Sequence, residues 1–96
     1  MSVIYVLIAR IPVADVPSFR AYEEVVLPLL PEHGGRLDRR MQSADGTLEV
    51  HLLEFETEDA LATFRADARR VAATRLLGSA QPELELVRMV DVTPNA

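Results

Sequence analysis

The sequence predicts an α+β fold in which a four-stranded antiparallel sheet carries two helices on one face. Segments with the two-residue period of strands and segments with helical spacing follow one another as strand, helix, strand, strand, helix, strand. The strands expected at residues 2–11, 48–56 and 83–92 are apolar on both faces. Two helices on one side cannot cover both faces of such a sheet, so a partner is expected on the other.

The first strand and the first helix are separated by a short turn. The strand at residues 2–11 is expected to end at Pro12, which cannot donate a backbone hydrogen bond. Asp15 is expected to cap a helix that runs to about Glu32. Pro28 lies inside this helix and removes one of its hydrogen bonds, which predicts a kink or a break.

The sequence HGGR at residues 33–36 connects the end of the first helix to the second strand. One of its glycines is expected to adopt the left-handed conformation that ends many helices. His33 belongs to this turn, or it shapes the rim of a pocket. A half-exposed edge strand is predicted at residues 36–43, with Leu37 and Met41 on one face.

The second half of the chain repeats the pattern. The Asp-Gly pair in SADGT, residues 43–47, predicts a tight hairpin into the strand at 48–56. Thr57 is expected to cap the second helix, which is expected to break near Asp67 and to end near Gly78. The last strand is predicted at residues 83–92.

Right-handed crossovers join these units into the ferredoxin-like βαββαβ arrangement, with the first and third strands at the centre. The uncovered sheet face then carries about seven apolar side chains, and leaving them in water forfeits on the order of 10 kcal/mol. We therefore expect a homodimer that forms through the open sheet face.

Composition limits the other functions. A chain of 96 residues with 49% hydrophobic content is expected to form a single domain, 1–96. Its net charge of −5 argues against a nucleic-acid partner. No apolar run is long enough for a membrane span and no signal peptide is evident, which predicts a cytoplasmic protein that does not bind membranes. Cysteine and lysine are absent, and no cofactor motif is present, so no cofactor is expected.

The chain resembles the dimeric α+β barrel superfamily over nearly its whole length. The resemblance is strongest in FRAYEEVVLPLLPEHGGR and HLLEFETEDALATF, residues 19–36 and 51–64. An aromatic pair on the first helix, a proline-broken helix end, HGGR and a Glu-Phe pair closing the third strand are similar to an uncharacterised family of unknown function within it. That family is distantly similar to NIPSNAP proteins and antibiotic-biosynthesis monooxygenases. The chain lacks tryptophan and the aromatic and asparagine constellation of the cofactor-free monooxygenases.

Glu54 is the first candidate catalytic residue. It shares a strand face with Val50 and Leu52, opposite Phe55, and so is expected to point into the space between two sheets. A carboxylate buried there would have a raised pKa and could act as a general base. The alternative is an ion pair with Arg10 or Arg88, or exposure at the strand end.

His51 is the second candidate. Glu49 lies two residues earlier on the same face, so the pair could offer two ligands to a metal ion. No third ligand is evident in the sequence, and we therefore predict no metal site and a hydrogen-bonded histidine. Tyr5 offers a hydroxyl on an apolar face, and Tyr5, Arg88 and Arg10 are predicted to bind a ligand.

Three functions fit these features. The first is binding or transformation of a small apolar or aromatic molecule without a cofactor, in an inter-sheet pocket lined by Tyr5, His51, Glu54 and Arg88. Its enzymatic versions are monooxygenase-like or isomerase-like. The second is a non-catalytic homodimeric module. The third is a ligand-sensing domain.

Overall fold

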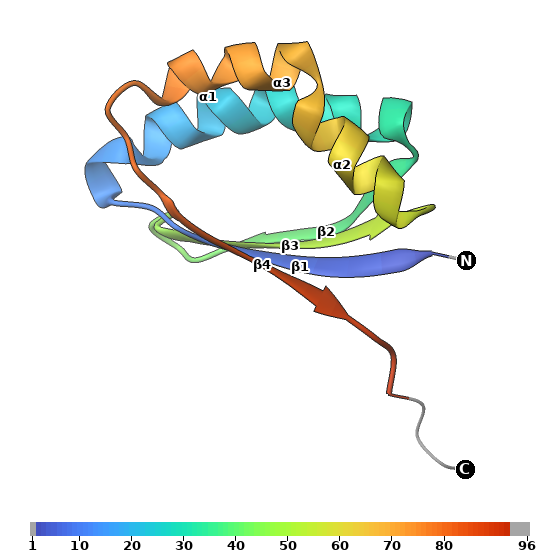
Figure 1. The fold of residues 1–96 in the computed structure, drawn as a ribbon. Helices are drawn as coiled ribbons and strands as arrows, with labels where there is room; N and C mark the ends of the chain where they lie inside the picture. Colours follow the sequence, from blue (N-terminus) through green and yellow to red (C-terminus); the bar gives the residue numbers. More distant parts are fainter. Residues whose placement is uncertain (1, 93–96) are drawn as a thin grey trace.

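The predicted ferredoxin-like architecture is confirmed by the computed structural model, which describes residues 2–92 (Figure 1). The four strands are β1 Val3–Arg10, β2 Gly35–Gln42, β3 Leu48–Phe55 and β4 Glu83–Met89. They form one sheet in the order β2-β3-β1-β4, and every neighbouring pair is antiparallel. β1 and β3 are central, as expected.

All the helices lie on one face of this sheet (Figure 1). They are, in chain order, η1 Val13–Asp15, α1 Val16–Val26, η2 Leu27–His33, α2 Glu58–Ala66, α3 Ala68–Ala73 and η3 Thr74–Leu77, where η denotes a 3-10 helix. The break predicted at Pro28 is confirmed, because the chain changes there from α1 to η2. None of the helices within residues 2–92 is both long and apolar enough to cross a membrane.

The helix ends show which local predictions hold. Thr57 caps α2 by accepting a hydrogen bond from the backbone N–H of Ala60 at 3.1 Å. Asp67 separates α2 from α3 and caps α3, because its carboxylate accepts from the backbone N–H of Arg69 at 2.8 Å. The prediction for Asp15 is wrong: its backbone is already helical and its side chain makes no capping hydrogen bond.

The core lies between the helices and the odd-numbered side chains of β1 and β3. Strand alternation places Phe55 and Leu53 under the helices, where they pack with Leu30 and Phe64. Phe55 is fully buried and Leu30 is 1% exposed. The helix-facing side of the sheet is therefore apolar around Leu53 and Phe55.

Two strand predictions need correction. β2 contains a bulge between Leu37 and Arg39, so Leu37 faces the helices whereas Met41 faces away from them. The two side chains therefore do not share a face. β4 ends at Met89 instead of residue 92, and Val90 lies beyond the strand with 76% of its surface exposed.

The side of the sheet away from the helices carries apolar side chains from all four strands, most of them on β1, β3 and β4. Pairing places Val6 of β1 beside Leu52 of β3 and Val87 of β4. We call this surface the open face; its apolar residues are Ile4, Val6, Ile8, Met41, Leu48, Val50, Leu52, Val87 and Met89. None of these nine side chains is among the buried residues of the chain.

Gly35 is expected to tolerate no side chain. A Cβ built there would lie 2.7 Å from the ring of Phe55 and 3.1 Å from the backbone oxygen of Leu30. We expect Gly35→Ala to lower the free energy of unfolding by about 1–3 kcal/mol, measured by urea denaturation. Gly34, with φ of 68°, supplies the predicted left-handed helix end. A Gly35→Ala variant as stable as the wild type would contradict this packing.

Candidate functional site

A cavity of about 140 Å³ lies between the helical layer and the sheet. Ten of the fourteen residues that line it are apolar or aromatic: Leu7, Tyr22, Val26, Leu27, Leu30, Leu53, Leu61, Phe64, Leu84 and Leu86. The fourteen lining residues together come from α1, η2, α2 and α3 and from β1, β3 and β4. We call this space the helix–sheet cavity.

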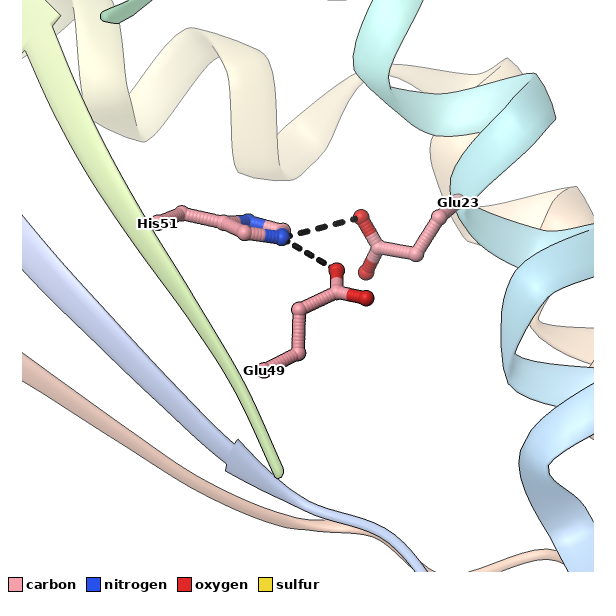
Figure 2. A group of neighbouring side chains, drawn as sticks. All are labelled: Glu23, Glu49 and His51. Atoms are coloured by element: carbon pink, nitrogen blue, oxygen red, sulfur yellow. Dashed lines mark hydrogen bonds and ion pairs between the residues drawn. The ribbon is translucent and has the colours of Figure 1, made fainter. Parts of the chain in front are cut away.

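Three buried polar side chains lie together under the helices at this cavity (Figure 2). Glu49 and His51 are each 1% exposed, and Glu23 is 4% exposed. We call Glu23, Glu49 and His51 the buried triad. Two of its members, Glu23 and His51, line the helix–sheet cavity. Burial of so many ionisable groups is expensive, which marks the triad as the candidate functional site.

Strand alternation and helical spacing position the triad. Glu49 and His51 are two residues apart on β3, so both side chains point toward the helices. Glu23 lies four residues after Phe19 and three before Val26, on the inner face of α1. Its side chain extends from the helix toward the imidazole of His51 (Figure 2).

Hydrogen bonds from three neighbours compensate the burial of Glu49. Arg40 donates from Nε at 3.1 Å and from a terminal nitrogen at 3.3 Å, and Gln42 donates its amide at 2.6 Å. His51 Nε2 forms the third contact. Burial alone would raise the pKa of Glu49, but the hydrogen bonds from His51, Arg40 and Gln42 outweigh it and lower the pKa to about 2.

Glu23 has no such compensation. Within residues 2–92 its carboxylate forms no side-chain hydrogen bond, and its nearest ionic partner is His51 Nε2 at 4.0 Å. Burial raises the pKa of Glu23 from 4.5 to about 7, and the nearby His51 only partly opposes this. His51 Nδ1 is also buried without a hydrogen-bond partner in the described part of the chain.

Arg65 and Arg70 are the other two polar residues that line the cavity. The guanidinium of Arg70 lies 5.6 Å from the ring centre of Phe64 and donates to the backbone oxygen of Arg65 at 3.2 Å. Its Nε is buried and has no partner among the described residues. The cavity thus has apolar walls, a buried acid–histidine cluster and a positively charged border.

The five predicted site residues do not share one pocket. Tyr5, His51 and Arg88 lie on the helix-facing side of the sheet. Tyr5 is paired with Leu53 on β3 and with Arg88 on β4, and paired residues point to the same side. His51 is two residues from Leu53 and shares its side. Of these three, His51 lines the helix–sheet cavity. Tyr5 packs edge-on against Phe55 at 6.2 Å, and Arg88 contacts Glu58 at the start of α2.

Glu54 and Arg10 lie on the opposite side, on the open face. Glu54 pairs with Arg36 at 2.5 Å, and Arg10 lies 3.9 Å from Glu85. The expected inter-sheet pocket containing both His51 and Glu54 is therefore wrong, because residues 51 and 54 are separated by an odd number of strand positions. The position of Glu54 on the open face agrees with the sequence prediction.

Glu23 is the residue that the sequence prediction missed. It occupies a position of the apolar stripe of α1, between Phe19 and Val26, where a charged side chain is unexpected. A helical projection of residues 19–26 would have placed this carboxylate on the buried face. Glu23 also supplies the third potential metal ligand, which the pair Glu49 and His51 lacked: the ligand atoms of all three lie within 4.8 Å of one another.

His33 lies outside the lining of the cavity and joins the two helical segments. Its Nε2 contacts the Asp67 carboxylate at 2.7 Å, and Arg69 contacts the same carboxylate at 2.8 Å. Hydrogen bonds from Arg69 and His33 hold the pKa of Asp67 well below its usual range. The role of His33 is therefore structural, tying the end of η2 to the junction of α2 and α3.

The comparisons with known proteins identify the fold. No family model and no curated protein matches the sequence. Among solved structures, a putative antibiotic biosynthesis monooxygenase from Nitrosomonas europaea is 16% identical with a TM-score of 0.76, covering 99% of this chain and 94% of its own. An uncharacterised NIPSNAP domain protein from Burkholderia xenovorans is 20% identical with a TM-score of 0.71, covering 99% of this chain and 100% of its own.

A third similar structure is SnoaB from Streptomyces nogalater, a cofactor-independent oxygenase. It is 14% identical with a TM-score of 0.69, and the match covers 98% of each chain. The structural neighbours thus include both groups that the sequence resembles, the NIPSNAP and the antibiotic-biosynthesis monooxygenase proteins. At this level of identity the likeness establishes the fold alone.

Proposed function

We propose that this protein binds a small single-ring molecule in the helix–sheet cavity, with a polar group of the ligand directed at Glu23 and His51. The observation that carries the proposal is the combination of an unfilled apolar space with two buried polar side chains on its lining. Binding pockets have this composition: mostly apolar walls with a few convergent polar groups.

The size of the cavity limits the ligand. An engineered apolar cavity of about 150 Å³ accepts one benzene molecule. The helix–sheet cavity, at about 140 Å³, therefore suits one aromatic ring with a small polar substituent. Leu84 on β4 also lines the cavity and is 55% exposed, so the space extends to the surface beside the edge strand.

We also propose that the binding unit is a homodimer joined through the open face. The support is the group of nine apolar side chains on this face, which come from all four strands and have the ion pairs Arg10–Glu85 and Arg36–Glu54 on the same side of the sheet. A twofold axis lets one such surface cover its own copy, as in most homodimers. An apolar centre with charged pairs around it is the common composition of such interfaces.

The ligand proposal is tested by calorimetric titration with phenol, and with toluene as a probe of the same ring without the hydroxyl. We expect saturable binding of one phenol per chain and at least tenfold weaker binding of toluene. Leu61→Trp, which fills the cavity from α2, should abolish phenol binding, whereas Val25→Trp on the exposed side of α1 should retain it. Phenol binding that survives Leu61→Trp, or no saturable binding to the wild type, would contradict the proposal.

Turnover of the bound molecule is a second candidate function. The specific observation that favours it is the buried carboxylate of Glu23 beside His51 at the cavity, a costly arrangement for a site that only binds. One structural neighbour is a cofactor-independent oxygenase. Oxygen uptake with a hydroquinone, lost in Glu23→Gln and retained in Glu24→Gln, would support an oxygenase. Without oxygen uptake by the wild type, binding would remain the function of the cavity and the oxygenase would be refuted.

A further inference from the structure

We propose that Glu23, Glu49 and His51 bind one divalent transition-metal ion beside the helix–sheet cavity. This inference deepens the proposed function, because the ion would hold the polar group of the ligand. Binding of the ion requires only the three residues of the buried triad and no bound ligand. The sequence pattern of Glu49 and His51 supplied two ligands without a third, and α1 supplies the third across the layer interface.

The geometry of the triad fits one ion. Two ligand atoms that each lie about 2.1 Å from the same ion can be at most about 4.2 Å apart. His51 Nε2 and Glu23 Oε2 are 4.0 Å apart, and all three ligand atoms lie within 4.8 Å of one another. Metal binding would replace the hydrogen bond between His51 Nε2 and Glu49: Nε2 would give up its proton, and side-chain rotations would bring the three ligand atoms to coordination distance.

The second observation is the state of Glu23 itself. Only 6% of the surface of its side chain is exposed, and the side chain forms no hydrogen bond within the described residues. It is directed at His51 (Figure 2). A buried carboxylate normally has a partner or coordinates a metal ion. A cation between Glu23, Glu49 and His51 would provide that partner.

The surroundings of Glu49 match the support that metal ligands receive. Arg40 and Gln42 hold its carboxylate from the β2 side and fix its orientation toward the triad. Hydrogen bonds of this kind orient ligands in characterised metal sites. Of the two arginines that line the cavity, Arg70 has its guanidinium engaged with Phe64 and a backbone oxygen.

The donor set indicates the class of metal. One imidazole nitrogen with two carboxylates suits zinc, cobalt, manganese or iron, whereas calcium and magnesium prefer oxygen ligands throughout. Three protein ligands leave at least one coordination position for water or substrate, as catalytic metal sites do. Because Glu23 and His51 line the cavity, that position would be open to a ligand bound there.

The test is a titration of EDTA-treated wild-type protein with Co²⁺, followed by visible absorption and by the thermal unfolding midpoint. We expect one Co²⁺ per chain, displacement by Zn²⁺ and no competition from a large excess of Mg²⁺. Glu23→Gln and His51→Gln should each weaken Co²⁺ binding at least tenfold. Matched controls are Glu24→Gln, an exposed neighbour on α1, and His33→Gln, the other histidine; both should bind as the wild type does.

Two results would overturn the metal site: no absorption change in the wild type, or unchanged Co²⁺ binding in Glu23→Gln. Glu23→Gln is the decisive variant, because it keeps the side-chain volume and removes an uncompensated charge, so it should fold even where His51→Gln does not. The two proposals fail separately. If the protein binds phenol but not Co²⁺, only the metal site is refuted. If it binds Co²⁺ but binds phenol neither with nor without the metal, only the ligand proposal is refuted.

Discussion

Replacing Val6 with aspartate is expected to convert the proposed homodimer into monomers. Val6 lies in the middle of the open face, flanked by Leu52 and Val87 on the neighbouring strands. In a twofold dimer each interface would bury two such charges, one from each chain, without a partner. We expect the dissociation constant to rise at least a hundredfold, which corresponds to about 2.8 kcal/mol.

Sedimentation equilibrium at micromolar protein concentration measures this change. Val71→Asp is the matched control, since Val71 is an exposed valine on α3, on the helical side of the molecule. That variant should remain a dimer. A wild-type protein that sediments as a stable monomer, or a Val6→Asp variant that stays dimeric, would show that the open face is not the interface.

Glu23→Gln is expected to stabilise the metal-free protein above pH 7. Burial raises the pKa of Glu23 from 4.5 to about 7, so the folded state binds more protons than the unfolded state between these two values. The contribution of Glu23 to stability therefore falls as the pH rises through this window and stays low above it. Glutamine has no charge to bury, so the variant escapes this loss.

The size of the effect follows from the shift. The rise in the pKa of Glu23 from 4.5 to about 7 corresponds to roughly 3 kcal/mol in the free energy of unfolding. Burial of the glutamine amide offsets part of it, so we expect a gain of about 1–2 kcal/mol at pH 8 and no gain at pH 4. Urea denaturation at the two pH values measures it, with EDTA present and Glu24→Gln as the control. A Glu23→Gln variant less stable than the wild type at pH 8 would contradict an uncompensated buried carboxylate.

Much of the fold was predictable because its rules are local. The two-residue period of β1 and β3 assigns Val6 and Leu52 to one face and Phe55 to the other. Pro28 falls well inside the helical pattern that begins near Asp15, where a proline removes a backbone hydrogen bond, and Thr57 has a side chain suited to capping. The bulge in β2 was not predictable, since it depends on the pairing of β2 with β3.

The site was predictable only in part, because its members come from separate elements. The spacing of Glu49 and His51 already indicated a shared face, but the identity of that face depended on which side the helices cover. Glu23 joins them only when α1 packs across β3. Reading Glu23 as an anomaly in the apolar stripe of α1 would have pointed to the helix side of the sheet instead of the space between two sheets.

The most direct test of the central claim is a methyl NMR titration of the wild-type protein with phenol. If the helix–sheet cavity is the binding site, the methyl signals of Leu7, Leu61 and Leu86 should shift in a saturable manner. Those of Ile8 and Val50, on the open face, should stay unchanged. Shifts confined to Ile8 and Val50, or no saturable shift in any methyl group, would contradict the assignment of function to this cavity.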